Sequence, residues 1–264
     1  MTTDSDVTTE KRRGLSSRVK NVADILTAGG SNLLAFSSPV LEEMYETRTV
    51  VDSEGQRIPL DGVITIPHAN ALHRTVTSTD AGVALELGMA YGGSALTILS
   101  ALAELDGERS LISIDPAEST YWRGIGAINV ERSGLGDRHR LIEQPDYLAL
   151  PELLRDGVSL DLAYIDGMHT FDYTLLDFFY IDRMLKVGGI VGFNDCYLPS
   201  VKRVLNFVRS HRHYREIDVG LKPSYVSRNV TRMVRNLATL TSKQDRYFQK
   251  QDGWEPEWHF YARF

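Results

Sequence analysis

The chain of 264 residues is poor in cysteine, in long apolar runs and in net positive charge. Its single cysteine, Cys196, excludes an internal disulfide framework and fits a reducing compartment. The longest candidate apolar stretch, Ala95 to Ala103, contains Thr97 and Ser100 and is too short to span a bilayer. The first residues hold no apolar segment of the kind that a secretory signal requires. We therefore expect a cytoplasmic protein without a membrane segment.

Charge and composition further limit the kinds of partner that we expect. There are 29 Lys and Arg residues against 35 Asp and Glu residues, which gives a formal net charge of -6. A surface of this average charge repels a nucleic-acid backbone and an anionic membrane, so we expect neither as a partner. The hydrophobic share of 42% and the charged share of 24% are ordinary for a globular protein.

Several catalytic and nucleotide-binding motifs are also missing. No Ser-His-Asp arrangement and no Cys-x-x-Cys pair is visible. The glycine-rich segment around Gly88 does not have the G-x-G-x-x-G spacing, and no lysine follows it as in a P-loop. A dinucleotide or triphosphate site is therefore disfavoured.

Short apolar runs alternate with segments of helical period through the middle of the chain. The five runs are Val83–Leu87, Ser110–Ile114, Arg140–Ile142, Leu160–Ile165 and Gly189–Phe193. Nearly all-apolar strands separated by helices are typical of parallel strands that are buried on both faces. With right-handed crossovers, the pattern predicts an α/β fold with a doubly wound, mostly parallel sheet.

The two ends of the chain have a different character. Residues 1–20 are polar and predict a flexible arm, and residues 21–264 predict a single domain that begins with helices over 21–76. Two further strands are predicted at Tyr214–Val219 and Trp258–Phe264, the second as an antiparallel C-terminal strand. The partly helical segment 220–256 between them is expected to lie near the substrate.

Polar residues follow the predicted strands where ligands bind in open α/β sheets. These strand ends carry Glu86 with Gly88, then Asp115, then Asp166, then Asn194 with Asp195. The glycines let the backbone pass close to a ligand, because no Cβ intrudes. Asp115 could accept the hydroxyls of a ribose, or it could cap a helix before Pro116. A glycine turn and an acidic residue together indicate an adenosine site, and S-adenosylmethionine fits it.

Three segments carry a family resemblance. They read ALELGMAYGGSALTILSAL, LISIDPAEST and LAYIDGMHTFDYTLLDFFYIDRMLKVGGIVGFNDC. They resemble the class I S-adenosylmethionine-dependent methyltransferases, and within them the small-molecule O-methyltransferases of the catechol and macrocin-sugar types. The resemblance covers about residues 66–208 and implies a Rossmann-like fold with S-adenosylmethionine as the cofactor.

The resemblance also implies roles for individual residues. Those implied to bind the cofactor are Glu86, Gly88, Gly92, Ser94, Asp115, Asp146, Tyr147 and Asp166. Among them, Asp115 would hold the ribose, and Asp146 with Tyr147 would flank the adenine. Tyr121 or Trp122 would cover the adenine face, or both are surface aromatics.

Three oxygen-bearing side chains suit a hard cation such as Mg²⁺, namely Asp166, Asn194 and Asp195. Catechol-type relatives bind magnesium at these positions, although their last pair reads Asp-Asn. Alternatively, Asp166 and Asp195 only accept backbone N–H groups. His169 occupies the position of the family's lysine base and can take up a proton near neutral pH. The alternative is that His169 orients Asp166 or caps a helix.

The sequence thus predicts methyl transfer to a hydroxyl of a small molecule, such as a sugar, a phenol or another secondary metabolite. His169 and Asp166 would act at the reacting centre, assisted by Mg²⁺. The alternatives are a non-catalytic adenosine-binding or assembly module, an N-methyltransferase, or an oxidative enzyme of antibiotic tailoring. The N-terminal helices suggest a possible homo-oligomer.

Overall fold

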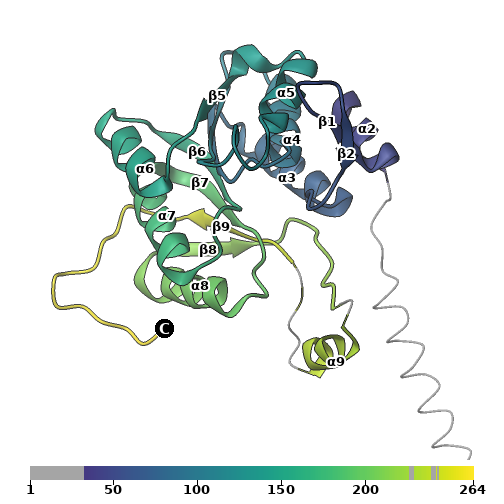
Figure 1. The fold of residues 1–264 in the computed structure, drawn as a ribbon. Helices are drawn as coiled ribbons and strands as arrows, with labels where there is room; N and C mark the ends of the chain where they lie inside the picture. Colours follow the sequence, from purple (N-terminus) through teal and green to yellow (C-terminus); the bar gives the residue numbers. More distant parts are fainter. Residues whose placement is uncertain (1–32, 226–228, 239–241, 243) are drawn as a thin grey trace, which may run out of the picture.

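A seven-stranded sheet forms the centre of this computed structural model, which describes residues 33–225, 229–238, 242 and 244–264 (Figure 1). Its strands lie in the order β5-β4-β3-β6-β7-β9-β8. They are β3 (Val83–Leu87), β4 (Ser110–Ile114), β5 (His139–Ile142), β6 (Leu160–Ile165), β7 (Leu185–Phe193), β8 (Tyr214–Ile217) and β9 (Arg246–Lys250). The first five run parallel, and β9 pairs antiparallel with both β7 and β8. The predicted doubly wound, mostly parallel sheet is confirmed.

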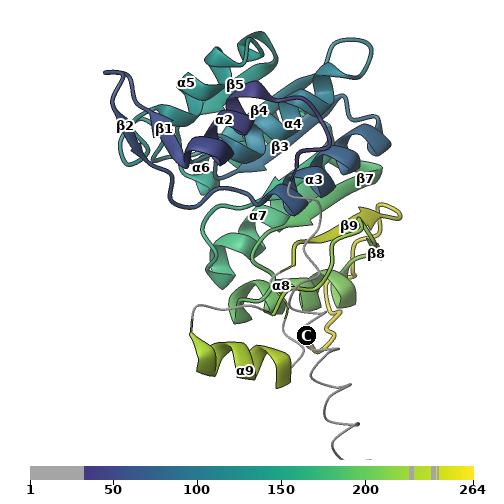
Figure 2. The same ribbon diagram turned by 90° about the vertical axis from the view of Figure 1, so that its right-hand side faces the viewer.

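Helices cover both faces of this sheet (Figures 1 and 2). They are α2 (Pro39–Thr47), α3 (Ile66–Thr79), α4 (Gly93–Ala103), α5 (Ile125–Arg132), α6 (Asp146–Arg155), α7 (Phe171–Met184) and α8 (Pro199–His211). A further helix, α9 (Val230–Ala238), stands apart from the sheet in both views (Figures 1 and 2). A short hairpin of β1 (Thr49–Val51) and β2 (Arg57–Pro59) precedes α3, and a 3₁₀ turn, η1 (Gly136–Arg138), precedes β5.

Two apolar cores result, because successive strand residues point to opposite faces. Ala84 packs with α2, α3, α4 and α5, whereas its neighbour Leu85 packs with α6, α7 and α8. The chain runs from β3 outward to β5 and then returns to β6 on the other side of β3. This reversal leaves a crevice beyond the carboxyl ends of β3 and β6, where open α/β sheets bind ligands.

The strand predicted at Trp258–Phe264 is wrong. The antiparallel strand is β9, which inserts between β7 and β8. Tyr247 and Phe248 are fully buried on opposite faces of the sheet, and this two-sided burial selects β9. The rings of Phe260, Tyr261 and Phe264 instead lie against α8, with the Phe264 ring centroid 5.4 Å from that of Phe207.

The structure describes only part of the N-terminal region for which an arm and helices are predicted. α2 lies within the predicted helical region 21–76, whereas α3 begins in it and continues to Thr79, and the β1–β2 hairpin lies between them. The predicted arm, 1–20, lies outside the described residues. Within the described part of the chain, no helix has the length and apolar character that crossing a membrane requires.

Candidate functional site

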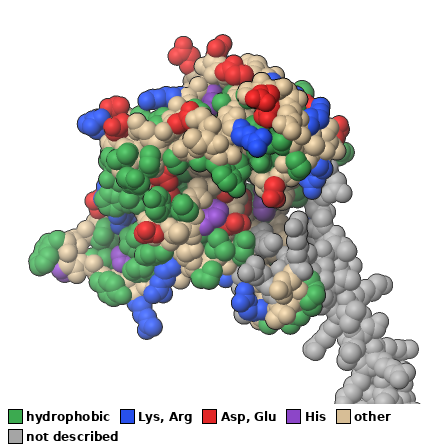
Figure 3. All heavy atoms as spheres, in the orientation of Figure 1, with side chains coloured by type: hydrophobic (Ala, Val, Ile, Leu, Met, Phe, Trp, Pro, Cys, Tyr) green, Lys and Arg blue, Asp and Glu red, His purple; other side chains and the backbone are tan. Residues whose placement is uncertain are grey.

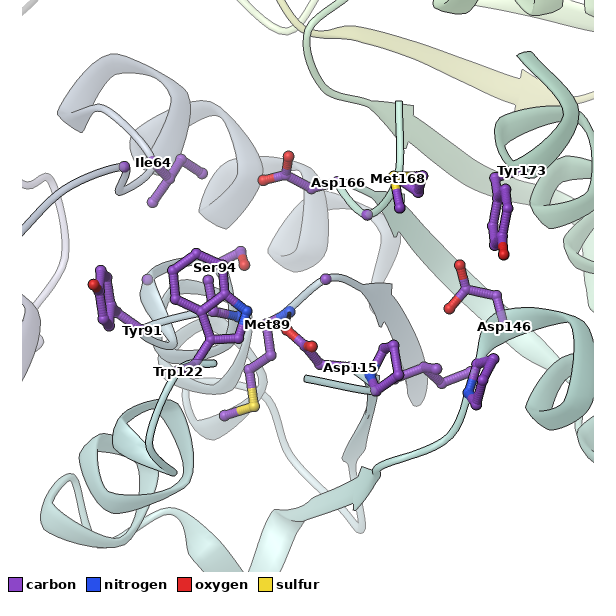
Figure 4. Close-up of a pocket in the computed structure, with 18 of the residues that line it drawn as sticks. Ile64, Met89, Tyr91, Ser94, Asp115, Trp122, Asp146, Asp166, Met168 and Tyr173 are labelled. Carbon is purple, nitrogen blue, oxygen red and sulfur yellow. Dashed lines mark hydrogen bonds between the residues drawn. The ribbon is translucent and has the colours of Figure 1, made fainter. Parts of the chain in front are cut away.

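A cavity of about 510 Å³ opens at the crevice between β3 and β6. Its wall comes from the loop before α3, the β3–α4 turn, the ends of β4 and β6, and the start of α6. Asp115, Asp146 and Asp166 approach this space from different elements (Figure 4). In the space-filling view, acidic and histidine side chains gather in a hollow at the middle of one face (Figure 3).

The glycine turn after β3 forms the floor of the cavity. Gly88 has a φ of +83°, and a Cβ there would lie 2.4 Å from the carbonyl oxygen of Asp166. The turn can therefore pass β6 only as glycine. Gly92 has a φ of +82° and precedes α4, whose first residues, Gly93 and Ser94, line the cavity. The unpaired N–H groups of this helix start favour an anionic group.

Asp115 ties the turn to the next strand. Its Oδ2 accepts hydrogen bonds from the N–H groups of Met89, at 3.0 Å, and Ala90, at 2.9 Å, and its Oδ1 accepts one from Ala117, at 2.9 Å. The carboxylate lines the cavity although it is only 4% exposed. Asp115 does not cap a helix, because the next helix begins only at Ile125; its carboxylate instead holds two turns, and its role in holding a ribose stays a prediction.

Glu86 lies behind the turn, fully buried. Its Oε1 accepts a hydrogen bond of 2.6 Å from Ser113, and its Oε2 has no partner among the described residues. Burial raises the pKa of Glu86 to about 7. The Ser94 hydroxyl, which lines the cavity, lies close enough to Glu86 to oppose this rise in its pKa. Contact between Glu86 and a cofactor stays a prediction.

The predicted adenine segment also reaches the cavity. Asp146 and Tyr147 begin α6 and line the wall, and the ring of Tyr147 lies 6.3 Å from that of Tyr173 on α7. Of the two other aromatic candidates, Trp122 lines the cavity, whereas Tyr121 is 74% exposed and packs against Trp122.

The predicted base lies between the two predicted metal carboxylates. His169 Nε2 is 3.7 Å from Oδ1 of Asp166 and 3.5 Å from Oδ2 of Asp195. Burial lowers the pKa of His169, so the ring is neutral at pH 7 and able to accept a proton. Asn194 hydrogen-bonds to Asp166 and donates through Nδ2 to the Tyr164 hydroxyl at 3.2 Å. Among the described residues, no three His, Cys, Asp or Glu side chains form a ready metal-binding group.

One acidic residue of this cluster has no signal in the sequence. Asp245 is 3% exposed, and its Oδ2 accepts a hydrogen bond of 2.8 Å from Tyr164. His68 Nδ1 lies 3.7 Å from its Oδ1. Burial, together with the charges of Asp245 and Asp195, raises the pKa of Asp166 well above its usual range. Asp245 precedes β9, so only the strand insertion brings it here.

Comparisons with known proteins agree with this architecture. The family model of a methyltransferase domain matches residues 85–196. No curated protein sequence matches the chain.

Solved structures show the same fold at low identity. The chain is 16% identical to the O-methyltransferase TomG from Streptomyces achromogenes, which is involved in tomaymycin synthesis and was solved with SAM; the match covers 83% of this chain and 93% of that one, with a TM-score of 0.60. It is 15% identical to an O-methyltransferase from Bacillus cereus in complex with SAH, over 71% and 86% of the two chains, with a TM-score of 0.58. It is 16% identical to SAH-bound PaMTH1, a methyltransferase from Podospora anserina, over 90% and 96%, with a TM-score of 0.55. Residues 85–196 thus match the model of a methyltransferase domain, and the chain has the Rossmann-like fold of these solved methyltransferases, which is the fold that its motifs predicted.

Proposed function

We propose that this protein transfers a methyl group from S-adenosylmethionine to a hydroxyl of a small molecule. The observation that carries the proposal is the cavity at the switch point of the sheet. Its wall brings together the glycine turn, the start of α4, and the carboxylates of Asp115, Asp146 and Asp166. The O-methyltransferases solved with SAM or SAH share this fold, which supports the same cofactor here.

The hydrogen bonds of Asp115 indicate how the ribose would be held. A carboxylate has about four acceptor positions. Backbone N–H groups use two on Oδ2 and one on Oδ1, which leaves Oδ1 able to accept from one ribose hydroxyl. The adenine would then lie toward Asp146 and Tyr147, and the carboxylate of the methionine part toward the N–H groups of α4.

Methyl transfer is an in-line displacement at sulfur, so the acceptor oxygen must be aligned and deprotonated. A neutral His169 next to the cavity wall suits the removal of that proton. Two carboxylates and one amide, from Asp166, Asp195 and Asn194, are a suitable donor set for Mg²⁺, and a cation would offset the repulsion between the charges of Asp166 and Asp195. When bound, Mg²⁺ would make a coordinated hydroxyl easier to deprotonate.

Calorimetric titration with S-adenosylhomocysteine tests the cofactor site. Wild type is expected to bind one equivalent, and Asp115→Asn is expected to bind at least about tenfold more weakly, because it loses a charge-assisted hydrogen bond. Asp156→Asn, on a side chain that is 59% exposed, is the matched control and should bind as wild type does. No binding by wild type, or unchanged binding by Asp115→Asn with a native unfolding curve, would contradict the proposed site.

The base is tested by His169→Gln, assayed with Mg²⁺ and a panel of hydroxylated acceptors. Turnover is expected to fall by about 10² to 10⁴-fold, which is the usual contribution of a positioned base. Affinity for S-adenosylhomocysteine should stay within about twofold, as in the control His259→Gln, whose side chain is 60% exposed. Because the pKa of His169 is lowered, the wild-type rate should decline only below its ordinary value of 6.5. Near-wild-type turnover by His169→Gln would exclude this base, and cofactor binding without turnover on any acceptor would favour the non-catalytic alternative.

A further inference from the structure

A second carboxyl group lies directly behind Asp146. Asp177, in the middle of α7, is fully buried, and Asp146, the first residue of α6, is 6% exposed. The two side chains are within hydrogen-bonding reach of each other. Asp146 lines the cofactor cavity and Asp177 does not (Figure 4). The pair therefore connects the cavity wall to the interior of the α6–α7 layer.

Neither carboxylate oxygen of Asp177 has a hydrogen-bond donor among the described residues. Two ionised carboxylates have only acceptors, so they cannot bond to each other. One proton on the pair changes this, because the protonated group then donates to the other. A shared proton is thus the one source of a hydrogen bond for Asp177 within the described chain.

The surroundings determine which residue keeps the proton. Burial next to the charge of Asp146 raises the pKa of Asp177 to about 9. Burial and the charge of Asp115 raise the pKa of Asp146 only to about 6, because a backbone N–H at the start of α6 stabilises the ionised form of Asp146. Around neutral pH, the proton therefore stays on Asp177.

Other groups facing the pair are few. The phenols of Tyr147 on α6 and Tyr173 on α7 lie nearby on the cavity side. The faces of β6, β7 and α8 that pack into this layer are apolar, with Ala163, Ile165, Val191, Phe193, Val201, Val204 and Leu205. Within the described ranges, no cation is among the groups that shift the pKa of either carboxyl of the pair.

We propose that Asp177 is a positioning residue for the cofactor's adenine, an inference that rests on the proposed function. Its protonated carboxyl donates to Asp146 and holds Asp146 as an ionised acceptor for the amino group of adenine. A base that presents an oxygen in place of this amino group would meet the same anionic acceptor and be rejected. Asp177 thus acts through Asp146 and does not itself contact the cofactor.

The test is the pH dependence of S-adenosylhomocysteine binding, measured by calorimetry from pH 7 to pH 10 in wild type, Asp177→Asn and Asp177→Leu. The asparagine amide can donate to Asp146 at every pH, whereas leucine cannot donate at all. Between pH 7 and pH 10, the affinity of wild type for S-adenosylhomocysteine should fall about tenfold more than the affinity of Asp177→Asn. The reason is that Asp177 ionises in this range and can then no longer donate to Asp146. The amino group of the ligand titrates in the same range, and comparison with Asp177→Asn removes its effect.

Asp177→Leu should bind at least about tenfold more weakly than Asp177→Asn already at pH 7. It should also discriminate less between S-adenosylhomocysteine and S-inosylhomocysteine. Parallel pH profiles for wild type and Asp177→Asn would overturn the inference while leaving the proposed function intact. Absence of wild-type binding at every pH would overturn the proposed function itself.

A measurement on the ligand-free protein tests the inference independently of cofactor binding. The infrared difference spectrum between wild type and Asp177→Asn at pH 8 should contain the carbonyl band of a protonated carboxyl group. Its absence would overturn the inference whether or not the cofactor binds. Thermal unfolding of each variant controls for folding, and Asp177→Asn should be at least as stable as wild type. The reason is that a raised carboxyl pKa reduces stability above the unfolded value of 3.8.

Discussion

Gly88→Ala is expected to lower the free energy of unfolding by about 3 kcal/mol or more and to abolish cofactor binding. A Cβ at this position would lie 2.4 Å and 2.8 Å from the carbonyl oxygen and carbon of Asp166, and 2.9 Å from the Cα of Gly167. All three atoms belong to the backbone, so none can rotate away. Relief requires β3 and β6 to separate at the point where the cavity forms.

Gly55→Ala provides the matched control for backbone strain. Gly55 has a φ of +78°, close to the +83° of Gly88, and a Cβ there meets nothing within 4 Å. The free energy of unfolding of this variant should fall by only about 1 kcal/mol, which is the usual cost of alanine in the left-handed region. Chemical denaturation of both variants isolates the effect of the close approach. Equal losses would show that the contact between the turn and β6 has no importance for stability.

The parts of the fold that could be predicted from the sequence are those set by local pattern. Apolar runs of strand length that alternate with helices leave a doubly wound sheet as the natural arrangement. The polar residues that end those runs, such as Asp115 and Asp166, must then share one rim. Residues next to strands therefore indicate which strand ends line the cavity, without any knowledge of tertiary contacts.

The features that escaped prediction depend on packing between distant segments. Arg246–Lys250 and 258–264 are both rich in aromatic residues, and only burial of Tyr247 and Phe248 on opposite faces distinguishes the true strand. Asp177 reads as one polar residue in a helical segment. Its lack of a donor becomes visible only when α6 brings Asp146 against it.

The order of the last two predicted metal ligands has a structural consequence. Asp195 has a φ of +48°, in the left-handed region that Asn and Asp tolerate better than most residues. The chain places the carboxylate on this residue and the amide on Asn194. The carboxylate thereby faces His169, while the amide reaches Tyr164 and Asp166. The swapped order thus brings a negative charge next to the proposed base and into reach of a cation.

Asp166→Asn is expected to reduce turnover by about 10³-fold, because the change removes the carboxylate shared by the cofactor cavity, the proposed base and the proposed metal set. Asparagine has nearly the same shape, so the backbone bond from the N–H of residue 166 to the carbonyl oxygen of Leu87 should persist. The fold should therefore remain, with unfolding close to that of wild type.

Two measurements distinguish a role of Asp166 in binding the metal from a role in binding the methyl donor. Titration of Mg²⁺ into the protein saturated with S-adenosylhomocysteine should show that wild type binds the cation. Asp166→Asn should bind Mg²⁺ at least about tenfold more weakly, because the affinity of a hard cation depends on carboxylate charge. Asp156→Asn should behave as wild type in both assays. Turnover of Asp166→Asn within tenfold of wild type would contradict a central role for this residue. Wild-type turnover that persists after complete chelation would exclude magnesium, and His169 would then have to remove the acceptor proton without a cation.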